Sequence, residues 1–288
     1  AESGCCYLVP TPIGHLADIS LRALSILHSV DCIAAEDTRI TARLLNYYNI
    51  HSRLISNHDH NEKERAAYLL SLLQQGLSLA VVSDAGMPLI SDPGFPVVRA
   101  LLDADIRIIP IPGACAALTA AIASGISTSE FSFLGFAPSR QQERRHWIEQ
   151  QKNRIESWIF YESKHRIRAV LADLSYVLEA ERQICVAREI TKQYETFYRG
   201  TLQQLAQNDL VDIMERGEFV VLIQGAGQRS TVTDNLENIK REFNAQELTQ
   251  ALQPLLSISD RAKLLASLFK VAKNTVYNLI LTAEKDKT

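Results

Sequence analysis

The chain of 288 residues is 47% hydrophobic and 22% charged, which is typical of a folded globular protein long enough for about two domains. Its formal net charge of −3 argues against a protein that holds nucleic acid through an overall positive charge, so any contact with RNA has to come from local patches. The five cysteines are an odd number without C-x-x-C spacing, which argues against a disulfide framework and against a zinc site.

The start of the chain and its hydropathy favour a cytoplasmic protein. The first residues, Ala-Glu-Ser-Gly, carry no basic stretch followed by an apolar one, so we expect no signal peptide. No run of about 18 apolar residues occurs, so we expect no membrane-spanning helix.

Short apolar runs alternate with helical patterns in the first part of the chain. The predicted strands are residues 6–10, 32–35, 79–83 and 107–111, and the predicted helices are 62–75 and 96–102. The runs are unbroken and β-branched or leucine-rich, as strands buried on both faces are. The alternation predicts an α/β domain, residues 1–112, with a mainly parallel sheet.

The same pattern restarts after Pro112 and Gly113, a pair that is typical of a junction. The predicted strands are residues 131–135, 158–161, 184–188 and 219–224, and the predicted helices are 140–151, 166–178 and 202–215. We therefore expect a second α/β domain, residues 113–226, with a mixed or parallel sheet.

The character of the sequence changes after about residue 225, where a Gly- and Ser-containing linker is expected. The predicted helices of the remaining chain are residues 248–256, 260–269 and 274–281. They indicate a small helical domain, residues 234–288, whose last two helices resemble a helix-turn-helix unit. A helical appendage that packs on the body or on a second copy would have the same spacing.

The common cofactor signatures are missing from the sequence. Neither G-x-G-x-x-G, nor a phosphate-binding G-x-x-x-x-G-K-[ST] loop, nor a G-x-S-x-G nucleophile turn occurs, which argues against dehydrogenases, nucleotidases and hydrolases. The first predicted strand runs instead into Val9-Pro-Thr-Pro-Ile-Gly14. Two prolines make a rigid turn with few free N–H groups, which suits an uncharged or cationic ligand better than a pyrophosphate.

Charged, aromatic or Gly- and Pro-rich clusters follow several predicted strands. They lie at residues 36–39, 83–94, 110–119, 160–166, 187–195 and 216–222. One such cluster is usually an ordinary turn or a solvated ion pair, but six at strand ends predict a lined cleft between two domains. His58 and His60 lack a third ligand at a recognisable spacing, so we expect no metal site.

Taken together, these clusters resemble the tetrapyrrole methylase superfamily, and within it the group that methylates ribosomal RNA of the small subunit. The matching stretches are Val9-Pro-Thr-Pro-Ile-Gly14, Ala35-Glu-Asp-Thr-Arg39, His58-Asp-His-Asn-Glu62, Val82-Ser-Asp-Ala-Gly86, Asp92-Pro-Gly94, Phe160-Tyr-Glu-Ser163, Arg188-Glu-Ile-Thr-Lys192 and Gly217-Glu218. They extend from near the N-terminus to about Gln224, in matching order and spacing.

The resemblance implies a homodimer of two α/β domains that binds S-adenosylmethionine in the cleft between them. It implies 2′-O-methylation of a cytidine ribose in the decoding region of 16S ribosomal RNA, with the small ribosomal subunit as partner. The implied cofactor-binding residues are Pro12, Gly86, Met87, Ile90, Cys115, Ala116, Tyr161 and Arg188. The chain departs from the group at Met87, Ala114 and His15, where Thr, Pro and Asn are usual; we expect Met87 to contact the cofactor through its backbone.

A ribose hydroxyl is a weak nucleophile that has to lose its proton, so a nearby carboxylate is expected to accept it. The candidates for this catalytic role are Glu162, Glu189 and Asp37. The candidates for holding RNA phosphates are Arg39, Arg166 and Lys192, each of which could equally pair with those carboxylates.

Two other functions remain open at this point. One is a methyltransferase of the same superfamily that acts on a tetrapyrrole or on a protein residue. The other is a non-enzymatic RNA-binding factor in ribosome assembly, which would use the positively charged tail. Titration with the cofactor would separate an enzyme from a binding module.

Overall fold

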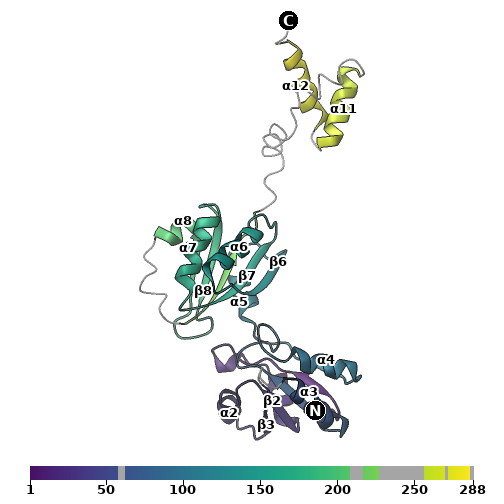
Figure 1. Cartoon of the computed structure of the whole chain (residues 1–288), viewed down its shortest axis with the longest axis vertical. Helices are drawn as coiled ribbons and strands as arrows, with labels where there is room; N and C mark the ends of the chain where they lie inside the picture. Colours follow the sequence, from purple (N-terminus) through teal and green to yellow (C-terminus); the bar gives the residue numbers. More distant parts are fainter. Residues whose placement is uncertain (58–61, 208–216, 227–255, 270–271, 286–288) are drawn as a thin grey trace. The chain divides into compact units, whose positions relative to one another are not determined.

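Residues 1–57, 62–207, 217–226, 256–269 and 272–285 are described in the computed structural model. The chain forms two compact units, Ala1–Ala226 and Gly227–Thr288. In Figure 1 the first unit is coloured from purple to green, and the described helices of the second are yellow. The described residues of the first unit form two five-stranded sheets.

The first sheet has the strand order β3-β2-β4-β1-β5, and every pairing in it is parallel. Its strands are β1 (Cys6–Leu8), β2 (Cys32–Ala35), β3 (Arg53–Ser56), β4 (Leu79–Val82) and β5 (Ile108–Pro110). The accompanying helices are the 3-10 helix η1 (Leu16–Asp18), α1 (Leu21–Ser29), α2 (Thr38–Tyr47), α3 (Glu62–Gln74) and α4 (Phe95–Asp103). Helices α1 and α2 cover one face of the sheet, and α3 and α4 cover the other.

This two-sided cover explains the unbroken apolar strands. All four residues of β2 and all four of β4 are buried, because successive side chains point into different cores. The four strands predicted in this region are present with slightly different ends. Strand β3 was not predicted; it is an edge strand with an exposed arginine and a single buried residue, Ile55, so it lacks the apolar run.

The second sheet has the order β6-β7-β10-β8-β9, with β6 and β7 parallel and the other pairings antiparallel. Its strands are β6 (Phe131–Phe136), β7 (Ser157–Ser163), β8 (Gln183–Arg188), β9 (Thr196–Thr201) and β10 (Glu218–Ile223). The helices are α5 (Ala116–Ala123), α6 (Gln141–Gln151), α7 (Ile167–Val177) and α8 (Leu202–Gln207). Helix α5 packs on one face, and α6, α7 and α8 pack on the other.

The four strands predicted in this region are present, and the unpredicted strand is again at an edge. Strand β9, with the sequence Thr-Phe-Tyr-Arg-Gly-Thr, has no fully buried residue, so its pattern lacks a buried strand's apolar run. The α/β fold with parallel and mixed sheets is as predicted. Of the helix predicted over residues 202–215, residues 208–216 lie outside the described part of the chain.

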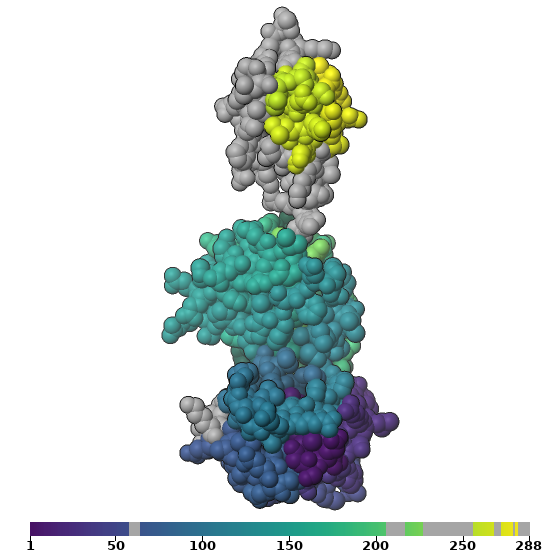
Figure 2. All heavy atoms as spheres, turned by 90° about the vertical axis from the view of Figure 1, so that its right-hand side faces the viewer, coloured from purple at the N-terminus to yellow at the C-terminus, as the bar shows by residue number. Residues whose placement is uncertain are grey.

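Residues of the two sheets are in contact within the first unit. The backbone N–H of His15 donates a hydrogen bond to the Thr191 hydroxyl at 3.1 Å, although 176 positions separate them. A Cβ on Gly14 would approach the side chains of Thr191 and Lys192 to 2.6 Å, so any larger residue would force these side chains to move. In the space-filling view of Figure 2 the purple and blue atoms of the first sheet's residues adjoin the teal atoms of the second.

The second unit contains α11 (Ile258–Phe269) and α12 (Lys273–Lys285), close to the helices predicted at 260–269 and 274–281. They pack through Ala262, Leu265, Val276 and Ile280. The predicted helix 248–256 lies almost entirely outside the described residues. Among the described helices, none combines the length and the apolar character needed to cross a bilayer.

Candidate functional site

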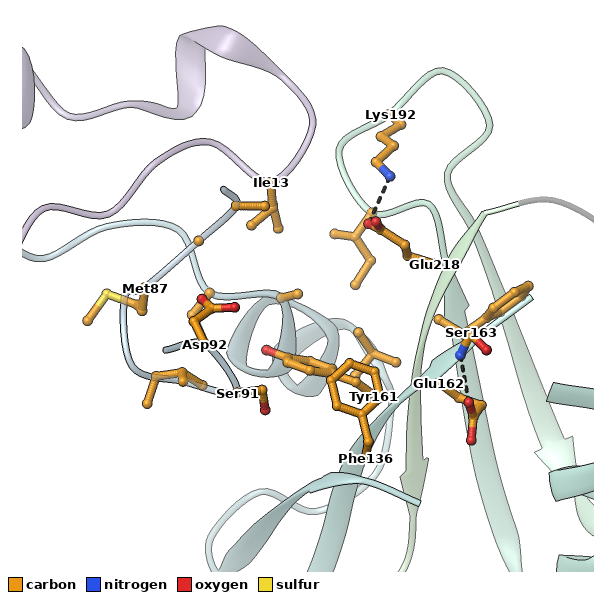
Figure 3. Close-up of a pocket in the computed structure, with 18 residues that line it drawn as sticks. Ile13, Met87, Ser91, Asp92, Phe136, Tyr161, Glu162, Ser163, Lys192 and Glu218 are labelled. Carbon is orange, nitrogen blue, oxygen red and sulfur yellow. Dashed lines mark hydrogen bonds and ion pairs between the residues drawn. The ribbon is translucent and has the colours of Figure 1, made fainter. Parts of the chain in front are cut away.

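A cavity of about 380 Å³ lies where the loops of the first sheet meet the second sheet (Figure 3). Its lining residues are Ile13, Ala85, Gly86, Met87, Ile90, Ser91, Asp92, Cys115, Ala116, Phe136, Tyr161, Glu162, Ser163, Ile190, Lys192, Glu218, Phe219 and Val220. Several of them lie at or after the carboxyl ends of β1, β4, β6 and β7, which is where ligands bind in open α/β sheets. The volume falls in the range of about 300–1,000 Å³ usual for small-molecule sites.

Thr11 and Gly86 join two of the loops that form the wall of the cavity. The Thr11 N–H donates to the Gly86 carbonyl at 3.0 Å, and the Gly86 N–H donates to the Thr11 carbonyl at 3.1 Å. Gly86 has a φ of 85°, and a Cβ there would lie 3.2 Å from Ile13 Cγ2. Glycine at this position therefore permits both the left-handed backbone and the close approach of the loops.

The loop between β4 and α4 holds two further residues in the left-handed region. Leu89 has a φ of 73° and Ser91 a φ of 68°, conformations that cost roughly 1–3 kcal/mol each for residues other than glycine. Such residues persist where the surroundings enforce them, and they often lie at binding sites. Here Leu89 and Ser91 lie on either side of Ile90, and Asp92 follows. Ile90, Ser91 and Asp92 line the cavity, and Leu89 does not.

Asp92 is a carboxyl group in this wall, and Figure 3 shows it directed toward the space beside Tyr161. Burial raises its pKa to about 6, with a smaller lowering effect from a hydrogen bond with Ser83 and a further increase from nearby Asp84. A cation bound in the cavity would stabilise the ionised form of such a carboxyl group.

Tyr161 and Phe136 form an aromatic side of the cavity next to the N-terminus of α5, and Phe133 packs against Tyr161. The Ala117 N–H donates to the Tyr161 hydroxyl oxygen at 3.3 Å. The Tyr161 ring lies edge-on to the rings of Phe133 and Phe136, with centroids 4.8 and 5.7 Å away. Burial raises the pKa of Tyr161, so the hydroxyl stays protonated. This side of the cavity is thus apolar with one hydroxyl.

Lys192 and Glu218 line another side of the cavity, and Glu189, outside the wall, pairs with Lys192. Lys192 Nζ lies 2.9 Å from Glu189 Oε1 and 3.0 Å from Glu218 Oε2. Burial raises the pKa of Glu189, but hydrogen bonds from Lys192 and from the Glu218 N–H outweigh it and leave the pKa below its usual value. Glu189 adopts a φ of 51°, and a Cβ on Gly217 would lie 2.7 Å from Glu189 Cδ. The cluster is therefore tightly built around the Glu189 carboxylate.

Glu162 borders the cavity, but its side chain faces away from it. Successive residues of a strand point to opposite faces, and Phe160 belongs to the core under α6 and α7 whereas Tyr161 faces α5. Glu162 Oε1 pairs with Arg166 at 2.8 Å, and the other carboxylate oxygen is buried without a hydrogen-bond partner among the described residues. Figure 3 shows the carboxyl group directed away from Tyr161.

The cavity thus brings together most of the residues predicted to bind the cofactor. The predicted cofactor residues in its wall are Gly86, Met87, Ile90, Cys115, Ala116 and Tyr161, joined by Lys192 from the RNA set and Glu162 from the catalytic set. Pro12 and Arg188 are outside the wall. Arg188 follows Ala187 in β8, and Ala187 faces α5. Because side chains alternate along a strand, Arg188 is directed to the face of the sheet away from α5.

Four other predicted residues also lie outside the wall: Asp37, Arg39, Arg166 and Glu189. Asp37 caps α2, and a hydrogen bond from Arg39 at 2.6 Å lowers its pKa to about 2. Arg166 is occupied by Glu162 and by the Ala137 carbonyl, to which it donates at 3.1 Å. The roles assigned to all these residues remain predictions.

Sequence reasoning did not select Ile13, Asp92, Phe136 and Glu218, although all four line the cavity. Asp92 and Glu218 lie in two of the clusters noted in the sequence, residues 83–94 and 216–222, and Phe136 ends β6. Selecting every charged or aromatic side chain at a strand end would therefore have included all three. Ile13 lies in the rigid proline turn after the first strand, where no single residue except Pro12 was predicted to bind the cofactor.

The described residues contain no group of three or more His, Cys, Asp or Glu that could hold a metal ion. His58 and His60 lie outside the described residues. All five cysteines are free, and Cys115 is the one that lines the cavity.

Residues 6–206 match the family described as Tetrapyrrole (Corrin/Porphyrin) Methylases. The chain belongs to this family. It is 42% identical over 276 residues to "Ribosomal RNA small subunit methyltransferase I" of Haemophilus influenzae, covering 96% of this chain and 95% of the relative. Proteins of the same name from Escherichia coli O157:H7 and Synechocystis are each 41% identical, with 97% and 98% of this chain covered and 96% and 99% of theirs.

Solved structures agree with the fold. A cobalamin biosynthetic enzyme, cobalt precorrin-4 methyltransferase, has a TM-score of 0.57 at 14% identity, covering 77% of this chain and 95% of its own. Uroporphyrin-III C-methyltransferase from Thermus thermophilus, complexed with S-adenosylhomocysteine, has a TM-score of 0.53 at 14% identity, covering 76% of this chain and 97% of its own. The predicted fold class and the predicted class of enzyme, a methyltransferase, are confirmed by family and fold together.

Proposed function

We propose that this methyltransferase transfers a methyl group from S-adenosylmethionine to 16S ribosomal RNA, at the ribose 2′-oxygen of a cytidine in the decoding region. The supporting observation is the near-complete coverage by relatives named for methylation of small-subunit ribosomal RNA. The choice of oxygen and nucleotide rests on the resemblance of the matched stretches. The protein would then act in rRNA processing, in the cytoplasm, where ribosomal subunits are assembled.

The residues of the cavity fit S-adenosylmethionine. The ligand combines a positively charged sulfur with an adenosine, and the cavity offers one hard-to-ionise carboxyl group, Asp92, beside apolar and aromatic side chains. Gly86, Met87 and Ile90 would hold the ligand from one side, with Ala116 and Tyr161 from the other. When bound, the cofactor supplies a methyl group activated by the adjacent positive sulfur.

The chain's own contribution is alignment, exclusion of water and removal of one proton. Holding two reactants in line can supply about 7–11 kcal/mol of the barrier reduction. Among the three predicted proton acceptors, Glu189 is in direct contact with the cavity residues Lys192 and Glu218. Glu162 points to the opposite face, and Asp37 is tied to Arg39. We therefore retain Glu189 as the proposed acceptor; its lowered pKa makes it a weak base, so alignment carries the larger share.

The experiment that tests this function is methyl transfer from labelled S-adenosylmethionine to assembled small subunits and to naked 16S RNA. The expected product is one 2′-O-methylcytidine, identified by mass spectrometry of nuclease fragments. Glu189→Gln should reduce turnover while the dissociation constant of the cofactor stays near the wild-type value. Equal turnover of this variant and the wild type would eliminate the proton-acceptor role, and label on neither RNA substrate would refute the function.

We further propose that the protein is a homodimer and that α5 contributes to its interface. The helix packs on the second sheet through Ala117, Ala120 and Ala121. On its other side Leu118 is 51% exposed and Ile122 is 83% exposed, four residues apart and therefore on one face. Neighbouring exposed apolar side chains of this kind mark protein interfaces.

A further inference from the structure

A basic surface lies on α6, α7 and the loops that lead into them, on the face of the second sheet opposite to α5. Strands β6 and β7 are parallel neighbours, so the loops that follow them emerge at the same edge of the sheet. Phe136, Tyr161 and Ser163, at the ends of these strands, line the cavity. Residues that follow them in the chain therefore start at the rim of the cavity.

The charge on this surface contrasts with that of the chain as a whole. We call it the α6–α7 basic surface; its exposed or partly exposed members are Arg140, Arg145, Lys164, His165, Arg166, Arg168 and Tyr176. Residues 163–172 contain Lys164, Arg166 and Arg168 and no acidic residue. The chain carries a formal net charge of −3, so this local excess of cations is not a consequence of overall composition.

One buried carboxylate holds two arginines at this surface. Asp173 is fully buried, and its two oxygens lie 2.6 Å from Arg144 and 2.6 Å from Arg145. Burial raises the pKa of Asp173, but the two arginines outweigh it and keep the carboxylate ionised. Arg144 is buried as well and also donates to the Ser139 carbonyl at 2.9 Å. One carboxylate neutralises one cation, so a positive charge is left over.

That remaining charge is presented by Arg145. The side chain is 38% exposed, whereas Arg144 is 4% exposed. The guanidinium carbon of Arg145 lies 4.1 Å from the centroid of the Tyr176 ring, and Tyr176 is 72% exposed. A cation and an aromatic ring are thus held together at the surface, with the arginine fixed from below by Asp173.

We propose that the α6–α7 basic surface binds the single-stranded RNA that flanks the methylated nucleotide. Arg145 and Lys164 contact phosphates, and Tyr176 together with Arg145 provides a stacking surface for a base. This assignment rests on the proposed function of the cavity. Proteins bind single-stranded RNA through aromatic rings and guanidinium groups on which bases stack, and through cations that contact the phosphates. An exposed aromatic ring beside an arginine offers both kinds of contact.

Arg166 has a different part in this surface. Its guanidinium is already engaged by Glu162 at 2.8 Å and by the Ala137 carbonyl at 3.1 Å. It joins the start of α7 to the end of β6 and holds the two loops together, so it acts as a positioning residue for the surface.

The test compares the wild type with Arg145→Gln/Lys164→Gln. The matched control is Arg99→Gln/Arg107→Gln, which removes two exposed cations from other elements. The probe is a fluorescein-labelled single-stranded RNA with the decoding-region sequence, and anisotropy is measured over a range of salt concentrations. Each lost phosphate contact should reduce the slope of log K against log salt by about 0.7, so the double variant should lose about 1.4. The control should keep the wild-type slope.

Tyr176→Ala tests the stacking part of the proposal. We expect its affinity for the same RNA to fall by about fivefold to a hundredfold, and Tyr176→Phe to keep most of it, because stacking needs the ring and not the hydroxyl. Calorimetric titration with S-adenosylmethionine should give wild-type affinity for every variant, which shows that the fold and the cavity are intact.

The outcomes separate this proposal from the function on which it rests. Suppose that the wild type methylates small subunits and that the variants bind RNA with the wild-type affinity and salt slope. This result would refute the proposed RNA-binding surface and leave the proposed function standing. If instead the variants bind RNA more weakly but the wild type transfers no methyl group, the RNA-binding surface is supported and the proposed function is refuted. For small subunits as substrate, the supporting result is a raised KM at unchanged kcat in Arg145→Gln/Lys164→Gln.

Discussion

Asp92 lies in the cavity wall, where its ionised form is poorly hydrated, and its pKa is about 6 instead of the ordinary value near 3.9. Its charge therefore changes within the range of pH in which the protein is assayed. A cationic ligand should favour the ionised form, and by linkage the ionised form should favour the ligand. The ligand preference of the cavity thus depends strongly on one residue.

We expect the affinity for S-adenosylmethionine to fall as the pH decreases through about 6, because protonation of Asp92 removes the negative charge. Asp92→Asn should bind more weakly at pH near 7.5, and between about pH 5 and 7 it should lose this pH dependence. Isothermal titration calorimetry over this range measures both effects. Asp103→Asn, which changes an exposed carboxylate, is the control.

The same substitution should alter stability with a predictable sign. Because folding raises the pKa of Asp92 from near 3.9 to about 6, its contribution to stability is full below about pH 4 and is lost as the pH rises through about 6. Without ligand, Asp92→Asn should therefore have a higher Tm than the wild type at neutral pH. The difference should shrink as the pH falls from about 6 and vanish below about pH 4, where Asp92 is protonated in both the folded and the unfolded chain. A Tm difference that persists at that pH would point to altered packing and not to ionisation.

Gly86 and Gly125 form a matched pair for testing the contact between the cavity loops. Both have positive φ, 85° and 78°, so alanine strains the backbone at either position. A Cβ on Gly86 would meet Ile13 at 3.2 Å, whereas a Cβ on Gly125 would meet nothing within 4 Å. Gly125→Ala should cost about 1 kcal/mol of unfolding free energy, and Gly86→Ala should cost more and weaken cofactor binding. Urea unfolding and calorimetry provide the two measurements; equal effects would show that the loop contact is unimportant.

At the scale of the elements, strand alternation decides which neighbours in sequence can serve the cavity. In β7, Tyr161 faces α5 and the cavity, while the next residue, Glu162, faces α6 and α7. Both belong to one matched stretch of the sequence, Phe160-Tyr-Glu-Ser163. A pattern of residues identifies such a stretch, and only the register of the sheet assigns each side chain to a face.

Helix α5 is the element on which the proposed dimer is tested. Ile122→Asp should convert a dimer into a monomer, because it places a charge in an apolar contact that excludes water. Sedimentation velocity measures the change in mass. Leu21→Asp, at an apolar position of α1 that is 86% exposed, is the control and should leave the mass unchanged. Retention of a dimer by Ile122→Asp would exclude α5 from the interface, and a monomeric wild type would refute the dimer itself.

At the scale of the whole molecule, every residue of the cavity lies in the first unit, Ala1–Ala226. The predicted division of this unit at residue 112 into two α/β domains remains a proposal, since contacts such as that of His15 with Thr191 cross it. The predicted helical domain, residues 234–288, falls inside the second unit.

A fragment of residues 1–226 should therefore fold and bind S-adenosylmethionine with the affinity of the full chain. Its two sheets keep their own cores, and none of the cavity lining is removed. Calorimetry on the fragment and on the full chain gives the comparison. A large loss of cofactor affinity in the fragment would show that the second unit supports the cavity.

The sequence by itself determined the central strands, most helix positions and the family. Central strands are buried on both faces and so carry unbroken apolar runs, as β2 and β4 do. Two edge strands, β5 and β6, were also predicted from their apolar residues. The other two, β3 and β9, are partly exposed to solvent and carry no such run, so they became evident only in the sheets. Tertiary structure alone decided that Asp92 and Glu218 meet Tyr161 in one cavity, and that Glu162 turns away from it. These facts depend on crossovers and on strand register, which bring together side chains far apart in the chain, and the residue pattern within a single segment does not encode them.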